Sequence, residues 1–190
     1  TLQNGKRKLI LIPCCATKFR AHLELAPAGS AGNHKSMVQP GESSAEILRR
    51  DAAVRRVPTP KVELFVRPDF LAPDLCADLI TLIDLNRRPS TIADANGDDA
   101  FRTSETCDLS ADDPTVQRLE TLLYDFTQID PAHGEPIQGQ RYEVGQEFKA
   151  HTDWFNPHGA DYQKFCSKAG QRTWTFMIYL NDVEAGGATR

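Results

Sequence analysis

Apolar residues recur at helical spacing in two stretches near the middle of the chain. The first predicts a helix over about residues 74–86, with an apolar face made of Leu75, Leu79, Leu82 and Ile83. The second predicts a helix from about Pro114, with an apolar face made of Val116, Leu119, Leu122, Leu123 and Phe126. Asp113 and Pro114 are a typical cap and first-position pair for it. We therefore expect two amphipathic helices, each of which buries one face.

Alternating apolar and polar residues predict strands on both sides of these helices. The expected strands cover residues 61–66, 137–142, 147–151 and 172–180, and a short extended segment covers 101–104. Val144 and Gly145 favour a turn. In the last strand Thr175 and Tyr179 share one face. Helices first and antiparallel strands afterwards imply an α+β fold, in which helices buttress a sheet or jelly roll.

Composition and charge divide the chain into two parts. The apolar fraction of 40% and the charged fraction of 25% are those of a globular protein, and the net charge is −4. Residues 1–57 carry ten Lys and Arg against four Asp and Glu, whereas residues 58–190 carry twelve against twenty-two. We expect a basic, poorly ordered leader over 1–57 and an acidic domain over 58–190. Such a domain lacks the clustered cations that nucleic acids require, and the leader is interpreted as a solvated tail.

The cysteines and the apolar runs indicate the compartment. The five cysteines are Cys14, Cys15, Cys76, Cys107 and Cys166. Their spacing matches neither a zinc pair nor a compact disulfide framework, so reduced thiols in a cytoplasmic protein are expected. The start of the chain is weakly similar to a secretory signal, but Pro13 interrupts its apolar run. No run approaches the roughly 20 apolar residues that cross a bilayer, so no membrane association is expected.

The tripeptide His151-Thr152-Asp153 is the first candidate for chemistry. On extended backbone, residues two apart project to the same side, so an imidazole and a carboxylate can bind one metal ion. Taken alone, the same pair is also typical of a hydrogen-bonded surface pair near a turn. The neighbouring sequence therefore has to decide between these interpretations.

That neighbouring sequence resembles a known enzyme family in several ordered blocks. Residues 135–154 read EPIQGQRYEVGQEFKAHTDW, and residues 172–183 read RTWTFMIYLNDV, followed by GGATR at 186–190. Both blocks, together with the Arg-Thr-Ser at 102–104 and the helix entry at 70–76, resemble the prolyl 4-hydroxylase type of Fe(II)- and 2-oxoglutarate-dependent dioxygenase. The resemblance covers about residues 58–190.

The resemblance implies a role for each matched residue. His151 and Asp153 would be two of three iron ligands, and Tyr142, Thr175 and Tyr179 would bind 2-oxoglutarate. Tyr142 and Arg172 would take part in catalysis. The peptide groove would include Arg102, Ser104, Glu135 and Arg172. The alternatives are ordinary core packing for each tyrosine and ordinary surface positions for the charged residues.

The resemblance also implies a fold and indicates how much of that fold these residues contain. The core would be a double-stranded β-helix, that is, a jelly-roll of the cupin-like kind, buttressed by the N-terminal helices. In the family the third iron ligand is a distal His, and a basic residue binds the far carboxylate of 2-oxoglutarate. Both would lie beyond Arg190, so the expected β-helix is incomplete at its C-terminus. We expect the 190 residues alone to bind iron weakly and to turn over little.

Three functions remain open at this stage. The first is hydroxylation of a C–H bond of a prolyl residue in a peptide or protein. It would use Fe(II), 2-oxoglutarate and O2, with ascorbate as a further cofactor, and would release succinate and CO2. A small molecule is the alternative substrate. The second is a catalytically inactive peptide-binding module of the same fold. The third is a divalent-metal hydrolase, which would need a metal-bound water and a positioned acid or base.

Overall fold

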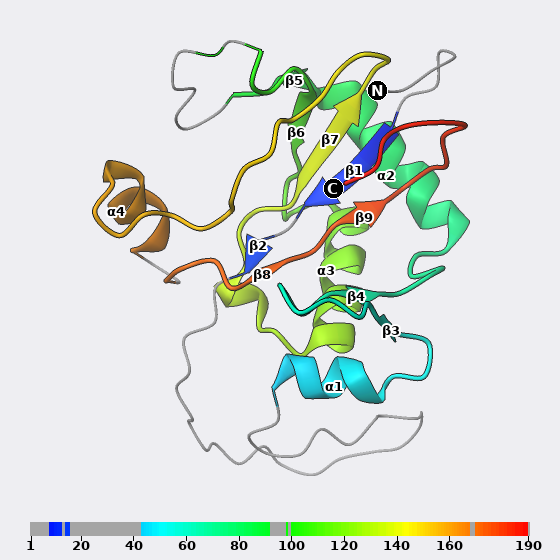
Figure 1. Ribbon diagram of the computed structural model, residues 1–190. Helices are drawn as coiled ribbons and strands as arrows, with labels where there is room; N and C mark the ends of the chain where they lie inside the picture. Colours follow the sequence, from blue (N-terminus) through cyan, green and yellow to red (C-terminus); the bar gives the residue numbers. More distant parts are fainter. Residues whose placement is uncertain are drawn as a thin grey trace.

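Figure 1 shows the computed structural model, in which residues 8–12, 14–15, 43–91, 98, 100–167 and 170–189 are described. Its centre is an antiparallel five-stranded sheet in the order β5-β6-β7-β1-β9. These strands are β5 (Arg88–Pro89), β6 (Glu105–Asp108), β7 (Gln138–Tyr142), β1 (Lys8–Ile12) and β9 (Ile178–Tyr179). Two small sheets pair β2 (Cys14–Cys15) with β8 (Trp174–Thr175), and β3 (Arg55–Arg56) with β4 (Phe65–Val66).

Two long helices pack behind one face of the central sheet (Figure 1). They are α2 (Pro73–Asn86) and α3 (Pro114–Thr127), and they confirm the two predicted helices. The side chain of Asp113 caps α3 by accepting a hydrogen bond of 2.8 Å from the Thr115 amide. The shorter helices are α1 (Ser44–Arg50), α4 (Ala160–Cys166) and the 3-10 helix η1 (Pro131–His133). Helices on one side of antiparallel strands make this an α+β fold, as expected.

The apolar core lies between these helices and the sheet. In α2, Leu75, Leu79 and Ile83 are fully buried, because positions four apart share one helical face. The remaining buried members of this core are Cys107, Leu109, Val116, Leu119, Ile137 and Leu180. The core thus joins both long helices to β6, β7 and the end of β9.

Strand β7 supplies side chains to both faces of the sheet. Gly139 faces α2 so closely that a Cβ there would lie 2.3 Å from Cγ1 of Ile83. Arg141 lies on the same side, donates to Glu105 at 2.9 Å and lies 3.6 Å from Asp84 of α2. Because side chains alternate along a strand, Gln140 and Tyr142 belong to the opposite face. One face of the sheet therefore packs on the helices, and the other is polar.

Several predicted strands are shorter than expected. The segment 147–151 contains only an isolated bridge between Phe148 and Arg102, so the prediction of a strand there is wrong. At 61–66 only β4 is a strand, and near 101–104 the ladder begins at Glu105. The predicted strand 172–180 is divided into β8 and β9, which pair with β2 and β1 respectively. These two partner strands flank Pro13 in the sequence, and a proline has no N–H for a ladder.

The described parts of the first 57 residues form regular elements, while the expectation of a poorly ordered leader over 1–57 stays a prediction. Strand β1 lies in the middle of the central sheet, between β7 and β9. Helix α1 begins with a capping box between Ser43 and Glu46, and its Leu48 is 2% exposed. A continuous apolar run such as Leu9 to Ile12 is typical of a strand with neighbours on both sides. The domain boundary at Pro58 stays a prediction.

Two further findings concern the thiols and the membrane. In the described part of the chain, Cys76, Cys107 and Cys166 are free thiols. Burial raises the pKa of each of these three groups, so each remains a neutral thiol at physiological pH. Among the helices of the described residues, none has the length and apolar character to cross a bilayer. The cytoplasmic location stays a prediction.

The contact between β7 and α2 gives the first testable prediction. Gly139→Ala should lower the free energy of unfolding by about 1–3 kcal/mol, because the new methyl group overlaps Ile83 in a filled core. Urea unfolding measures this loss. Combining it with Ile83→Ala, which removes the clashing atoms, should cost less than the sum of the two single losses. Strictly additive losses would show that overlap with Ile83 is not the cause of the loss at Gly139.

Candidate active site

The polar face of the central sheet carries the two predicted tyrosines, Tyr142 and Tyr179. Gln140 of β7 pairs with Ile10 of β1, which also pairs with Tyr179 of β9. Residues directly opposite one another in antiparallel strands project to the same face, so Gln140 and Tyr179 share it. Tyr142, two residues after Gln140, also lies there. The two tyrosines expected to bind 2-oxoglutarate therefore flank β1 on one side of the sheet.

The loop that carries His151 and Asp153 follows a tight turn after β7. Gly145 adopts a φ of 86°, which a residue with a side chain rarely does, and this reverses the chain. The returning segment is then tied to the chain before β6. The Thr103 amide donates to the Glu147 carbonyl at 2.9 Å, and the Lys149 amide donates to the Phe101 carbonyl at 3.0 Å. These bonds hold the loop beside Arg102 and Ser104.

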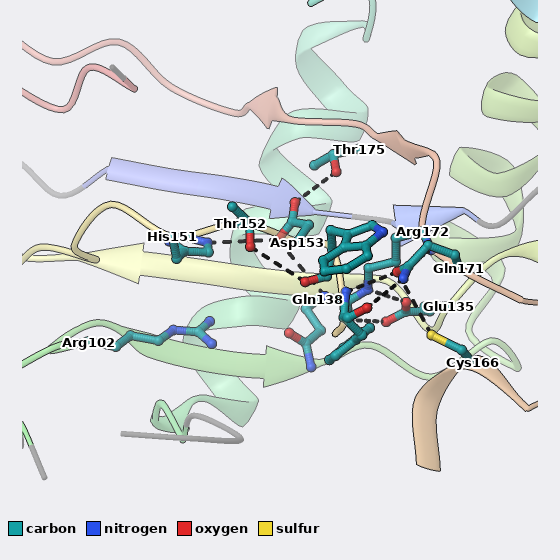
Figure 2. A network of polar contacts seen from close by, with 12 residues as sticks. Arg102, Glu135, Gln138, His151, Thr152, Asp153, Cys166, Gln171, Arg172 and Thr175 are labelled. Carbon is teal, nitrogen blue, oxygen red and sulfur yellow. Dashed lines mark hydrogen bonds and ion pairs between the residues drawn. The ribbon is translucent and has the colours of Figure 1, made fainter. Parts of the chain in front are cut away.

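His151 and Asp153 lie together, as Figure 2 shows. Nε2 of His151 is 3.8 Å from Oδ1 of Asp153, and both side chains are about one third exposed. Nδ1 of His151 lies 2.7 Å from the Lys149 carbonyl oxygen. A carbonyl can only accept, so Nδ1 is the donor and Nε2 is the nitrogen left facing the carboxylate. The pair converges through a bend after Lys149, not through strand alternation.

An aromatic ring supports the imidazole of His151. Phe148 stacks on it with ring centroids 3.6 Å apart and planes inclined by 19°. Phe101 meets the Phe148 ring edge-on at 5.8 Å, and the Arg102 guanidinium lies 4.6 Å from its centroid. Together with the bond to the Lys149 carbonyl, this stacking restricts rotation of the imidazole.

The second oxygen of Asp153 is bound from β8. The Thr175 hydroxyl donates to Oδ2 of Asp153 at 2.8 Å. Arg172 approaches Oδ1 to 3.9 Å with one nitrogen and forms two hydrogen bonds to Glu135 with others. The carboxylate is therefore oriented by one hydroxyl and lies beside one cation, as Figure 2 shows.

Arg102 and Ser104 lie in a polar network around Gln140. Arg102 donates to the side-chain oxygens of Gln140 at 2.6 Å and Thr106 at 3.1 Å, and to Ser104 at 3.3 Å. Burial lowers the pKa of the Arg102 guanidinium, which nevertheless stays charged at neutral pH. Gln140 is fully buried, and sequence reasoning did not select it. Its position two residues before Tyr142 on β7 was the available signal.

The two tyrosines have different surroundings. Burial raises the pKa of Tyr142, while a hydrogen bond with Ser104 and the nearby Arg102 oppose the change. Tyr142 therefore keeps its hydroxyl proton at neutral pH and can donate it. Tyr179 is 45% exposed, and its hydroxyl lies 2.8 Å from that of Thr189.

The described residues thus form three neighbouring groups. One contains His151, Asp153 and Thr175, one contains Glu135 and Arg172, and one contains Arg102, Ser104 and Tyr142. Arg172 links the first two groups, and the ring of Phe148 links the first to the third. Among the described residues, no group of three metal-binding side chains is present. The sequence also leads us to expect one cavity that is lined by Tyr142, His151, Asp153, Thr175 and Tyr179, and this stays a prediction.

Comparisons with known proteins identify the family. The chain is 36% identical over 131 residues to the Arabidopsis thaliana protein named "Probable prolyl 4-hydroxylase 8", across 66% of this chain and 43% of that protein. It is 36% identical over 126 residues to "Probable prolyl 4-hydroxylase 10" of the same plant, across 64% and 42%. It is 32% identical over 152 residues to the plant's "Prolyl 4-hydroxylase 2", across 77% and 49%. No family model matches the chain, and no solved structure matches it significantly.

These similarities extend over roughly two thirds to three quarters of the chain. The chain belongs to the prolyl 4-hydroxylase type of family, as the sequence blocks indicated. It spans less than half the length of each of these three relatives.

The pair of Glu135 and Arg172 gives the second prediction. Glu135→Gln and Arg172→Gln, alone and combined, should yield a coupling energy of about 1–3 kcal/mol in urea unfolding, because the contact is bidentate and charge-assisted. The control is the pair of Arg88 and Asp108, whose side chains are 46% and 52% exposed. Its coupling should be about 0–1 kcal/mol. Equal coupling in both cycles would contradict a structural role for the first pair.

Proposed function

We propose that this chain is part of an Fe(II)- and 2-oxoglutarate-dependent hydroxylase that acts on peptidyl proline. In this proposal His151 and Asp153 bind the metal, and the polar residues around them bind the peptide. The observation that carries the proposal is the approach of Nε2 of His151 to Oδ1 of Asp153 at 3.8 Å, with Nδ1 already committed to a carbonyl. Membership of the prolyl 4-hydroxylase type of family supports the reaction. The proposed complete fold is a double-stranded β-helix.

The residues present fit a divalent metal ion. An imidazole whose Nδ1 carries the proton has a lone pair on Nε2, which here faces a carboxylate oxygen. The lone pairs of Nε2 and Oδ1 repel each other, and a proton or a cation between the two atoms would remove this repulsion. A neutral imidazole with a carboxylate is a ligand set that suits Fe(II), and it requires one further ligand.

The surrounding side chains would orient the ligands and the 2-oxoglutarate. The hydroxyl of Thr175 holds Oδ2 of Asp153, which leaves Oδ1 for the metal. Tyr142 and Tyr179 present hydroxyl groups on the same sheet face and are proposed to bind a carboxylate of 2-oxoglutarate, together with Thr175. Tyr142 acts as a donor, because its raised pKa keeps the hydroxyl protonated. When bound, Fe(II), 2-oxoglutarate and O2 would supply the oxidation, with succinate and CO2 as products, and ascorbate would keep the iron reduced.

The polar groups flanking the pair are proposed to bind the peptide. Arg102, which donates to Ser104, lies on one side of His151, and Arg172, which is paired with Glu135, lies beside Asp153. Figure 2 shows Arg102, Arg172 and Glu135 around the pair. Guanidinium and carboxylate groups suit the carbonyl and amide groups of an extended peptide. Arg172 and Tyr142 are proposed to assist catalysis by orienting the reacting residue. A small molecule is the alternative substrate.

A second candidate function is a peptide-binding module without catalysis. It is favoured by the charged and polar side chains of Arg102, Ser104, Glu135 and Arg172, which would bind a peptide without a metal ion. The two proposals differ in whether metal binding and 2-oxoglutarate turnover accompany peptide binding.

The third prediction tests the metal pair. His151→Ala and Asp153→Ala should each reduce Mn(II) affinity at least about 10-fold, because losing a directly binding side chain costs no less than losing a supporting one. Mn(II) titration followed by electron paramagnetic resonance measures this. In the protein at its full natural length, succinate formation from 2-oxoglutarate with a proline-containing peptide should disappear in both variants.

His158→Ala serves as the matched control, since this exposed histidine lies in the same loop. Its Mn(II) affinity and turnover should equal those of the unmodified protein. Peptide binding without Mn(II) binding or succinate formation would replace the hydroxylase proposal with the binding module.

The fourth prediction concerns Thr175. Thr175→Val removes the hydroxyl that holds Asp153 and keeps the shape, so Mn(II) affinity should fall about 10–100-fold. Thr175→Ser keeps the hydroxyl and should retain most of the affinity. If valine and serine behave alike in the same titration, the hydroxyl has no role in orienting the carboxylate.

A further inference from the structure

The side chain of Gln171 forms hydrogen bonds to both main-chain groups of Phe155. The Phe155 amide donates to Oε1 of Gln171 at 3.0 Å, and Nε2 of Gln171 donates to the Phe155 carbonyl at 2.7 Å. Oε1 also accepts from the Arg172 amide at 3.1 Å. The Gln171 side chain thus satisfies the N–H and the carbonyl of Phe155 as the main chain of a neighbouring strand would. The two residues are 16 positions apart in the sequence.

The ring of Phe155 is held at the same place. The Arg172 guanidinium lies 4.6 Å from its centroid, and the Phe165 ring stacks on it at 5.2 Å with planes inclined by 16°. Phe165 belongs to α4, whose next residue, Cys166, is buried. Phe155 therefore connects the segment that follows Asp153 to α4 and to the residues that precede β8.

This clamp lies between two groups of the candidate site. Asp153 is two residues before Phe155, and Arg172 follows Gln171 directly. The bonds between Phe155 and Gln171 therefore close the loop that contains α4. Next to this closure, Oδ1 of Asp153 lies 3.9 Å from a guanidinium nitrogen of Arg172, and Oδ2 lies 2.8 Å from the Thr175 hydroxyl. The two bonds between the Gln171 side chain and the Phe155 main chain thus tie the two ends of this loop together.

We propose that Gln171 is a positioning residue that sets the place of Asp153 by clamping the main chain of Phe155. Its amide is suited to the task because it offers one acceptor and one donor at the spacing of a peptide group. A carboxylate lacks the donor, and a thioether of similar length lacks both functions. The consequence for metal affinity rests on the proposed function, whereas the placement of Asp153 does not.

Gln171→Met and Gln171→Glu test this, with Gln163→Met in α4 as the matched control because Gln163 is exposed in the same loop. Hydrogen exchange of the Phe155 amide reports the clamp. The chemical shift of the Asp153 side-chain carboxyl carbon, measured without metal, reports the placement of Asp153. We expect faster exchange and a moved resonance in Gln171→Met, with no change in Gln163→Met. Gln171→Glu should keep the bond from the Phe155 amide and still move the resonance, since it loses the donor to the Phe155 carbonyl.

Mn(II) affinity should fall about 10–100-fold in Gln171→Met, as for other residues that orient a ligand. An unmoved Asp153 resonance despite faster exchange at Phe155 would overturn the positioning role, and so would unchanged exchange. If the resonance moves while neither the unmodified protein nor any variant binds Mn(II), the clamp stands and the metal-binding function fails. Near-ultraviolet circular dichroism identifies a variant that has not folded, in which case the other Gln171 variant decides.

Discussion

Alternation along β7 is the constraint on which the core and the candidate site both depend. Gly139 permits α2 to approach the strand, because any side chain there would overlap Ile83. The next residue, Gln140, is buried on the opposite face and is the acceptor around which Arg102 and Thr106 are arranged. A shift of one residue in the register of β7 would exchange these two environments. The packing of the helices and the polar face of the sheet are thus set by the same five residues.

The loop that carries His151 and Asp153 is held by polar contacts more than by apolar burial. Thr103 fastens its beginning, Thr175 binds Asp153, and Gln171 fastens Phe155. Side-chain hydrogen bonds of this kind contribute about 0.5–1.5 kcal/mol each, which is less than a buried leucine contributes. The loop therefore belongs to the less stable part of the fold, and a bound cation would stabilise it further.

The resemblance to prolyl 4-hydroxylases and the geometry support each other at particular positions. Residues of different blocks meet in the structure: Thr175 donates to Asp153, and Arg172 donates to Glu135, although these residues are far apart in the sequence. Phe148 belongs to the block 135–154, and Gln171 directly precedes the block 172–183. Phe148 stacks on His151 and Gln171 binds the main chain of Phe155, and neither residue was selected from the sequence. Buried hydroxyl and amide groups on the other side link Arg102 to Tyr142 through Ser104.

The sequence by itself determined the elements whose signals are local. The apolar periodicity of α2 and α3, the cap at Asp113 and the turn at Gly145 each depend on neighbouring residues, and each is present in the structure. The tertiary structure alone decided which distant segments pair. It placed β1 between β7 and β9, divided the expected strand 172–180, and replaced the expected strand 147–151 by a bend that brings Nε2 of His151 to Asp153. Strand pairing and side-chain contacts between distant segments depend on register and on the space left by other elements, and no local pattern encodes these.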